Sequence, residues 1–319
     1  MAAGHRSVRG VAAVAAVVIA GAVLLAQDVT LRYHWNKDET LRYRLTQETA
    51  VTMTGTPMGD MQMGTTMGQV YTMTARDVTD ASARVEATFE SIRMVVNSPA
   101  GSMAYDTSAA TKASDPVIAE AGKMFDAMVG KSMTVTLTPT GGVEKVEGLS
   151  ALSQAMQGAM PQGAMPGSGL DTLMSDDAMK GMFSQSFQSF PGKAVRQGET
   201  WQNQMTVPNP LAPLAFTGTH TFTGLVPLDG RDVAHITSII AVKPGEGGGG
   251  AGLGGLPMTV TVGAGNGDTE TWFDHRLGRV VKMVGHMTLP MTMSMTAPDG
   301  STLSMDASTR TTTTMELVK

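Results

Sequence analysis

The sequence predicts a mainly β protein (α+β): a curved antiparallel sheet or half-barrel made of two fused β-meander repeats, with two to three covering helices. Three observations lead to this prediction. Long stretches alternate apolar and polar residues, two shorter stretches carry apolar residues at helical spacing, and the second half of the chain repeats the pattern of the first. Strict alternation on a Thr- and Val-rich background is typical of antiparallel strands with one buried face.

The repeat is visible in short matched segments. Lys-Asp-Glu-Thr-Leu-Arg-Tyr at 37–43 is matched by Arg-Gln-Gly-Glu-Thr-Trp-Gln at 196–202. A strand and turn at 137–146 are matched in the same way at 273–282. A repeat of this length reflects architecture rather than chemistry. It leaves open whether the two copies form one sheet or two.

The first 26 residues are predicted to be a signal peptide that takes no part in the fold. Arg6 and Arg9 form a short basic region, and an apolar run follows from Val11 to Ala26. The run is about 16 residues long, shorter than the roughly 20 that cross a bilayer. We therefore expect export to the periplasm or the outside of the cell, with Gln27 first in the mature protein. A retained N-terminal membrane anchor is the alternative.

Composition restricts the classes of function. There is no cysteine, so disulfides, thiolate metal sites and thiol nucleophiles are excluded. The formal net charge of −5 becomes −7 once Arg6 and Arg9 are removed, and no basic cluster remains, which argues against a nucleic-acid partner. Methionine is in excess, with 27 residues, and its flexible side chain suits adaptable apolar contacts.

Each part of the chain has an expected role. Residues 27–148 are predicted to form the first β-meander half, in which Pro116 begins a helix over 116–129. Residues 149–192 are a helical connector rich in Met, Gly and Pro, whose second helix carries Phe187 and Phe190. Residues 193–319 form the second half.

The second half is predicted to contain a flexible Gly-rich loop at 244–257 and to end in a hairpin. This hairpin would pair His286–Met295 with the residues that follow Leu303, across Pro298-Asp299-Gly300.

Several of these features resemble a known family. The signal peptide, the Gly-Glu-Thr-Trp segment at 198–201, the Gly-x-Val turns near 142–143 and 278–280 and the Met/Thr strands resemble an uncharacterised family of exported bacterial proteins. That family is similar in predicted architecture to the lipoprotein-carrier (LolA/LppX-like) fold. The resemblance implies a curved sheet closed by helices around an apolar cavity for a lipid-like ligand, with no catalytic residues. Many LppX-type members carry a lipidated cysteine, which this chain lacks.

The apolar helical faces are the candidate ligand-binding site. Such faces either cover a packed core or form a lid over a ligand, and methionine and phenylalanine suit flexible apolar ligands. The candidate residues are Met124, Phe125, Met128, Met182, Phe183, Phe187 and Phe190. We expect an apolar or lipid-like small molecule as partner, with an envelope protein as the alternative, and no cofactor.

The methionines between the first strands permit a further hypothesis. Met53, Met58, Met61, Met63 and Met67 have soft thioether sulfurs, which are ligands for Cu(I). The alternative is that they are ordinary core residues.

Nothing in the chain predicts catalysis. It contains no His-Glu-x-x-His, no Gly-x-Ser-x-Gly and no phosphate-binding Gly-rich loop. The histidines are scattered, and we expect a lone strand histidine such as His220 to be a surface or packing residue. We therefore expect a non-enzymatic protein that binds an apolar ligand, or else a structural protein of the cell envelope.

Overall fold

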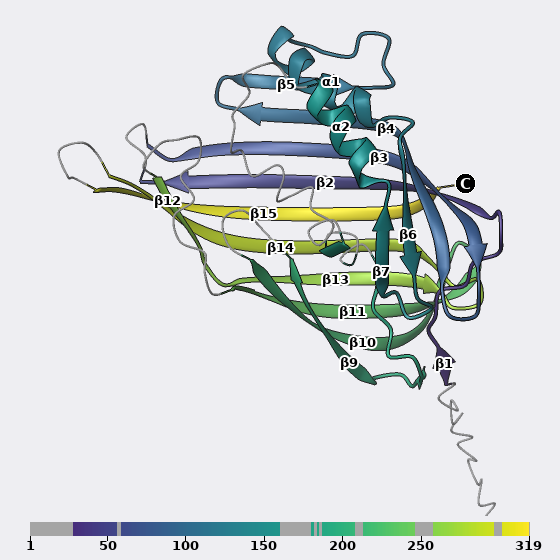
Figure 1. Cartoon of the computed structure of the whole chain (residues 1–319). Coiled ribbons are helices and arrows are strands. Elements are labelled where there is room, and N and C mark those ends of the chain that lie inside the picture. Colours follow the sequence, from purple (N-terminus) through teal and green to yellow (C-terminus); the bar gives the residue numbers. More distant parts are fainter. Residues whose placement is uncertain are drawn as a thin grey trace, which may run out of the picture.

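Figure 1 shows the computed structural model of the chain. The structure describes residues 28–55, 59–159, 180–181, 184, 187–207, 213–245, 258–296 and 302–318. The predicted signal peptide at 1–26 lies outside the described residues, as do most of the connector at 149–192 and most of the loop at 244–257.

The first half contains seven strands and one helix. The strands are β1 (Val29–Thr30), β2 (Thr40–Thr54), β3 (Met61–Val78), β4 (Ala83–Ser98), β5 (Gly101–Asp106), β6 (Ser132–Leu137) and β7 (Val143–Glu147), and the helix is α1 (Pro116–Met128). A second helix, α2 (Leu149–Ala159), lies at the start of the connector. The second half contains β8 (Ala194–Val195), β9 (Thr200–Val207), β10 (Leu214–Leu228), β11 (Arg231–Pro244), β12 (Met258–Val262), β13 (Gly265–Asp274), β14 (Arg279–Thr296) and β15 (Thr302–Val318).

Thirteen of the strands form one continuous antiparallel sheet, which settles the question of one sheet or two. Its order is β7-β6-β4-β3-β2-β15-β14-β13-β11-β10-β9, with β5 paired to β4 and β12 paired to β14. The mainly β prediction is therefore confirmed, as is the final hairpin, in which β14 pairs with β15. β15 also pairs with β2, and it thereby joins the two meanders.

The repeat has a three-dimensional counterpart in two equivalent turns. The Glu39 carboxylate accepts a hydrogen bond from the Asn36 amide at 3.1 Å, and the Glu199 carboxylate accepts one from the Arg196 amide at the same distance. The third position of both turns has a positive φ, 63° at Asp38 and 84° at Gly198. The matched sequence segments therefore fold alike.

One end of the sheet is closed by the segment between β1 and β2, residues 31–39, which we call the plug. The Tyr33 amide donates to the Pro139 carbonyl at 2.7 Å, and the His34 amide donates to the Gly278 carbonyl at 3.1 Å. Tyr33 and Leu31 are buried in the main core. We call this the plugged end; the opposite end, which holds the β2–β3 and β14–β15 connections, is the distal end (Figure 1).

The two faces of the sheet differ in charge. Ion pairs such as Arg42–Glu90 and Lys282–Glu316 lie on the outer face. The inner face carries the buried side chains, among them Leu41, and the helices lie against it (Figure 1). Exposed ion pairs contribute little stability, so the stabilising burial of apolar surface is provided by the inner face.

Both helices cover the part of the inner face formed by β4, β5 and β6. In α1, Ile118 and Phe125 pack against Ile92 and Tyr105, and Gly122 lets the helix approach the Tyr105 ring where a Cβ would overlap it. In α2, Leu152 packs against Ala87 and Met133 of the sheet. None of the described helices is long and apolar enough to cross a membrane.

The helix predicted through Phe187 and Phe190 is wrong at those residues. Residues 187–190 are not helical and lie along the inner face. The Gln188 amide donates to the Tyr33 hydroxyl at 2.9 Å, and the Phe190 amide donates to the Thr140 carbonyl at 2.9 Å. These bonds, one to the plug and one to the turn between β6 and β7, replace the bonds that a helix would make. We call residues 187–190 the strap.

Candidate functional site

The inner face of the four central strands is the candidate site. Its residues alternate with charged outer residues such as Arg44, Glu48 and Arg310. The strand register places on this face Leu45, Gln47, Thr49, Val51 and Met53 of β2, Met61, Met63, Thr65 and Met67 of β3, Met287, Leu289, Met291 and Met293 of β14, and Met305, Thr309, Thr311 and Thr313 of β15. We call this set the methionine face.

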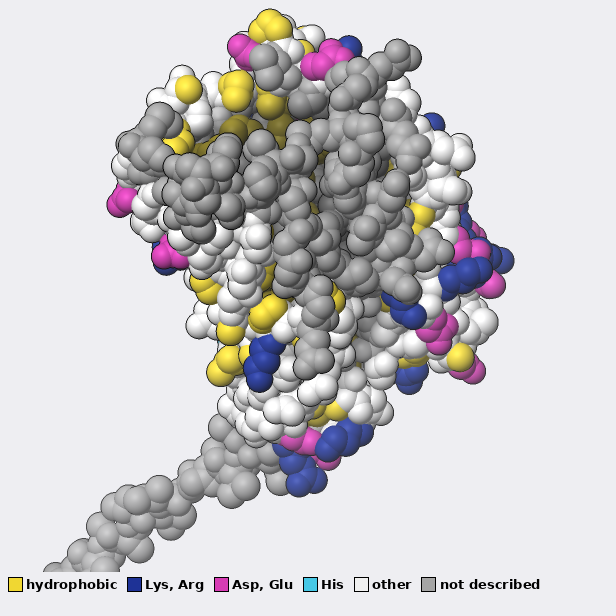
Figure 2. Space-filling view, turned by 60° about the vertical axis from the view of Figure 1, so that its left-hand side comes forward, with side chains coloured by type: hydrophobic (Ala, Val, Ile, Leu, Met, Phe, Trp, Pro, Cys, Tyr) yellow, Lys and Arg dark blue, Asp and Glu magenta, His cyan; other side chains and the backbone are white. Residues whose placement is uncertain are grey.

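The methionine face is uncharged yet not fully covered by the described residues. Most of its side chains are half-buried, and Met63 is 39% exposed. Viewed toward the distal end, hydrophobic side chains are visible in several patches, and most charged side chains lie toward the rim (Figure 2). An apolar surface of this kind is typical of binding sites rather than of a finished protein exterior.

Three predicted site residues lie together at one border of this face. Phe125 is buried, and Met124 and Met128 are half-buried, in a cluster that includes Phe89 and Met67. Because Met67 belongs to the methionine face, the apolar side of α1 is continuous with that face. The helix therefore forms one wall of the candidate site.

The other predicted site residues do not join them. Met182 and Phe183 lie outside the described residues. Phe187 and Phe190 belong to the strap, where their ring centroids lie 5.7 and 5.2 Å from that of Tyr33. Phe190 also packs edge-on against Phe273 at 4.6 Å. These two rings consolidate the plugged end, away from α1.

The strap rests on a buried polar network that the sequence did not predict. His220 Nδ1 lies 2.8 Å from Ser238 Oγ and 3.1 Å from Gln188 Nε2, and its Nε2 lies 2.8 Å from Asn203 Oδ1. Thr271 donates to Gln188 Oε1 at 3.2 Å.

These partners select one state of the imidazole. A neutral ring protonated on Nε2 donates to Asn203 Oδ1, and its single Nδ1 lone pair is shared by the Ser238 hydroxyl and the Gln188 amide. Burial lowers the pKa of His220 from 6.5 to about 4, which favours this neutral form. In the sequence, the only indication of this network was that His220 and Phe222 share a strand face. Gln188 is too distant from His220 in the chain for their contact to be predicted.

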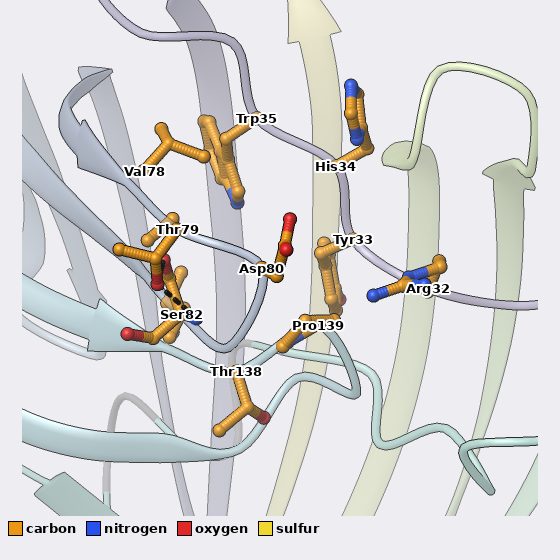
Figure 3. A pocket seen from close by; sticks show the side chains of 12 residues that line it. Arg32, Tyr33, His34, Trp35, Val78, Thr79, Asp80, Ser82, Thr138 and Pro139 are labelled. Carbon is orange, nitrogen blue, oxygen red and sulfur yellow. Dashed lines mark hydrogen bonds between the residues drawn. The ribbon is translucent and has the colours of Figure 1, made fainter.

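A pocket of about 380 Å³ lies at the plugged end (Figure 3). It is lined by Arg32, Tyr33, His34, Trp35, Val78, Thr79, Asp80, Ser82, Ala83, Leu137, Thr138 and Pro139. The Asp80 side chain rises between the rings of Trp35 and Tyr33 in this view. Trp35 Nε1 is buried and has no hydrogen-bond partner among the described residues. The pocket is lined by both polar and apolar side chains, and none of them belongs to the methionine face.

A model of one protein family matches the chain. It is described as a family of unknown function, DUF6263, and it matches residues 80–264, more than half of the 319 residues. No curated protein matches the chain.

Three solved structures give weak likenesses. The outer membrane channel COG4313 from Pseudomonas putida F1 is 6% identical, with a TM-score of 0.26 over 90% of this chain and 97% of that chain. A domain described as a candidate outer membrane lipoprotein-sorting protein from Vibrio parahaemolyticus is 8% identical, with a TM-score of 0.14 over 86% and 83%. A DUF1329 family protein from Desulfovibrio piger is 9% identical, with a TM-score of 0.13 over 86% and 85%. Likenesses of this size establish no shared fold.

Proposed function

This chain belongs to the DUF6263 family, and we propose that it is an exported, non-enzymatic protein that binds an apolar or lipid-like ligand on its methionine face. The observation that carries the proposal is the contrast between the two sides of the central strands. The outer side bears charged residues, whereas the inner side is uncharged and half-exposed. A sheet with one apolar face needs a partner for that face.

The chemistry of the face supports a flexible, chain-like ligand. Its eight methionines adapt their side chains to different shapes, and its threonines offer hydroxyl groups to a polar end. Each buried methylene of an acyl chain contributes about 0.8 kcal/mol, so even a partly covered chain would bind. Strands such as β2, with 15 residues, extend for roughly 50 Å, which is longer than an acyl chain requires.

Export rests on the apolar N-terminal run, which follows the short basic region at Arg6 and Arg9 as in a signal peptide. The helix wall formed by Met124, Phe125 and Met128 would contact the ligand at the border with β3 and β4. A structural protein of the envelope is the alternative, in which a second protein covers the same face.

Native mass spectrometry of protein purified gently from its own envelope tests the proposal. A stoichiometric lipid adduct, identified after extraction, is the expected result. A mass equal to that of the protein alone, with no uptake of added lipid, would leave the structural alternative.

A pair of variants locates the ligand. Val51 points to the methionine face, and its neighbour Ala50 points outward and is exposed. With cis-parinaric acid as the fluorescent probe, Val51→Glu should weaken binding at least about tenfold, because a buried charge faces the apolar chain. Ala50→Glu adds the same charge on the other side and should leave the affinity nearly unchanged. Equal effects of the two substitutions would place the ligand elsewhere.

A further inference from the structure

We propose that the pocket at the plugged end binds an apolar α-amino acid in its zwitterionic form. None of the residues that line this pocket belongs to the methionine face, so the site is separate from that of the lipid-like ligand. Three features of the pocket point to this ligand: an aromatic wall, two unpaired charges of opposite sign, and a buried N–H group without an acceptor.

The pocket has walls from the plug, the β3–β4 turn and the end of β6. The plug is anchored by the bond from the Tyr33 amide to the Pro139 carbonyl at 2.7 Å. The β3–β4 turn is closed by the Thr79 hydroxyl, which donates to the Ser82 carbonyl at 3.0 Å. The volume of about 380 Å³ is at the small end of the range for ligand pockets, which suits a ligand of amino-acid size.

The inner part of the pocket is aromatic and apolar. Tyr33 and Trp35 are only 6% and 7% exposed, and both belong to the main core. Ala83 and Leu137 are also buried and line the same pocket. Such a wall favours an apolar ligand side chain, and the face of a tryptophan also attracts an ammonium group.

The exposed part of the pocket carries one charge of each sign. Among the described residues that line it, Arg32 and Asp80 are the only ones drawn from Lys, Arg, Asp and Glu. Both are exposed, and neither has an ion pair or a side-chain hydrogen bond to any described residue. Arg76, which precedes the same turn, is by contrast paired with Glu86 at 2.9 Å. A ligand that carries both charges complements this arrangement.

The Trp35 indole N–H is a donor that lacks an acceptor. Trp35 Nε1 is buried, and no described residue accepts its hydrogen bond. Leaving a buried donor unsatisfied costs free energy, which a ligand acceptor recovers. The indole nitrogen is on the side of the ring nearer Asp80 (Figure 3). Because Asp80 is exposed and unpaired, its side chain can turn to admit a ligand carboxylate to this N–H.

These groups together define one binding mode. The ligand ammonium pairs with the Asp80 carboxylate, which stands between the Trp35 and Tyr33 rings in Figure 3. One oxygen of the ligand carboxylate accepts from the Trp35 indole and the other from Arg32, whose long side chain is free to reach it. An α-amino acid bears both charged groups on one carbon, so it presents them to a single pocket, whereas a residue inside a peptide has neither.

Calorimetric titration of the purified protein with L-phenylalanine and two analogues tests the need for both charges. 2-Phenylethylamine lacks the carboxylate, and 3-phenylpropionate lacks the ammonium group. Each analogue should bind at least about tenfold more weakly than L-phenylalanine, because it loses a hydrogen bond between charged groups. Undetectable binding of L-phenylalanine at millimolar concentration would overturn the proposal, as would equal affinities for all three compounds.

Two variants assign the charges to their side chains. Asp80→Asn should weaken L-phenylalanine binding at least about tenfold without weakening that of 3-phenylpropionate, which has no ammonium group. Arg32→Gln should weaken L-phenylalanine binding to a similar extent without weakening that of 2-phenylethylamine. Asp77→Asn and Arg44→Gln are the matched controls, because both residues are exposed and lie outside the pocket lining. Pocket variants that bind all three compounds as the controls do would refute the proposed site.

The indole N–H resonance of Trp35 gives a local measurement on the unaltered protein. The chain has three tryptophans, so each indole signal is easily resolved in a ¹⁵N correlation spectrum. L-Phenylalanine should shift the Trp35 signal. The Trp201 signal should stay in place, because its N–H already donates to the Ser189 carbonyl at 2.7 Å. Saturation with L-phenylalanine that leaves the Trp35 signal unmoved would place the ligand elsewhere and overturn the proposal.

Discussion

At the scale of single residues, Gly278 shows how tightly the plug is fitted. Its φ is 65°, and an added Cβ would overlap the backbone of His34. The Gly278 amide also donates to the Asp274 carbonyl at 2.7 Å, and the Asp274 carboxylate caps the Leu277 amide at 2.9 Å. Glycine is required here for two reasons: the left-handed backbone and the close approach of another segment.

Gly278→Ala should therefore destabilise the protein more than an alanine in an equally left-handed but open turn. Gly230 provides that control, because its φ is 75° and no atom lies within 4 Å of an added Cβ. Gly230→Ala should cost about 1–2 kcal/mol for the backbone alone. Gly278→Ala should cost at least about 1 kcal/mol more, through the clash with the plug. Urea denaturation measures both, and equal midpoints would contradict the fit described for His34.

At the scale of elements, the strap illustrates where sequence reasoning succeeds and where it stops. The alternating strands, the helix that begins at Pro116 and the final hairpin follow from local periodicity, and the structure contains them. The helix predicted through Phe187 and Phe190 rested on the same kind of periodicity. Its failure has a physical cause: Gln188 bonds with Tyr33 and with His220, partners far away in the chain.

The candidate site was also predictable only where it depends on local sequence spacing. The residues Met124, Phe125 and Met128 were predicted from helical spacing, and the structure brings them together. The methionine face needs strand register as well as period, since its members come from both ends of the sequence. Neither the pocket around Trp35 nor the network around His220 has a local signature.

The strap should loosen in acid. The pKa of His220 is about 4 in the folded state and 6.5 when unfolded, so the unfolded state binds more protons between these values. The stabilisation is complete above about pH 6.5 and is lost as the pH falls toward 4, amounting to about 3 kcal/mol. Burial also lowers the pKa of His275, so this residue likewise contributes stability that is lost as the pH falls.

Urea unfolding at about pH 7 and about pH 4.5 measures this loss. His220→Gln, which cannot gain a proton, isolates the contribution of His220 from that of His275 and the carboxylates. The variant should lose less stability than the parent between the two pH values. An identical loss would show that His220 does not titrate in this range.

At the scale of the whole molecule, β15 is the strand that makes two meanders into one sheet. It pairs with β14 over Lys282–Thr296 and with β2 over Arg42–Thr54. A chain that stops after Thr296 should lose cooperative unfolding, because β2 and β14 would each have a bare edge. Circular dichroism during thermal unfolding would measure this. A deletion of Asp28–Thr30 is the control, because it removes the short β1–β8 pair and the buried Val29 side chain but none of the strands of the thirteen-stranded sheet. A single sharp transition in the truncated chain would contradict the role of β15.

The position of β15 also governs the order in which the fold can form. It follows every other described strand in the chain, and its partner β2 precedes almost all of them. Until β15 emerges, β2 and β14 each have one unpaired backbone edge, in segments rich in threonine, valine and methionine. Long-range pairing of this kind is slow, and bare edges invite association with other chains. The nascent molecule therefore depends on being kept apart from its neighbours until its last strand arrives.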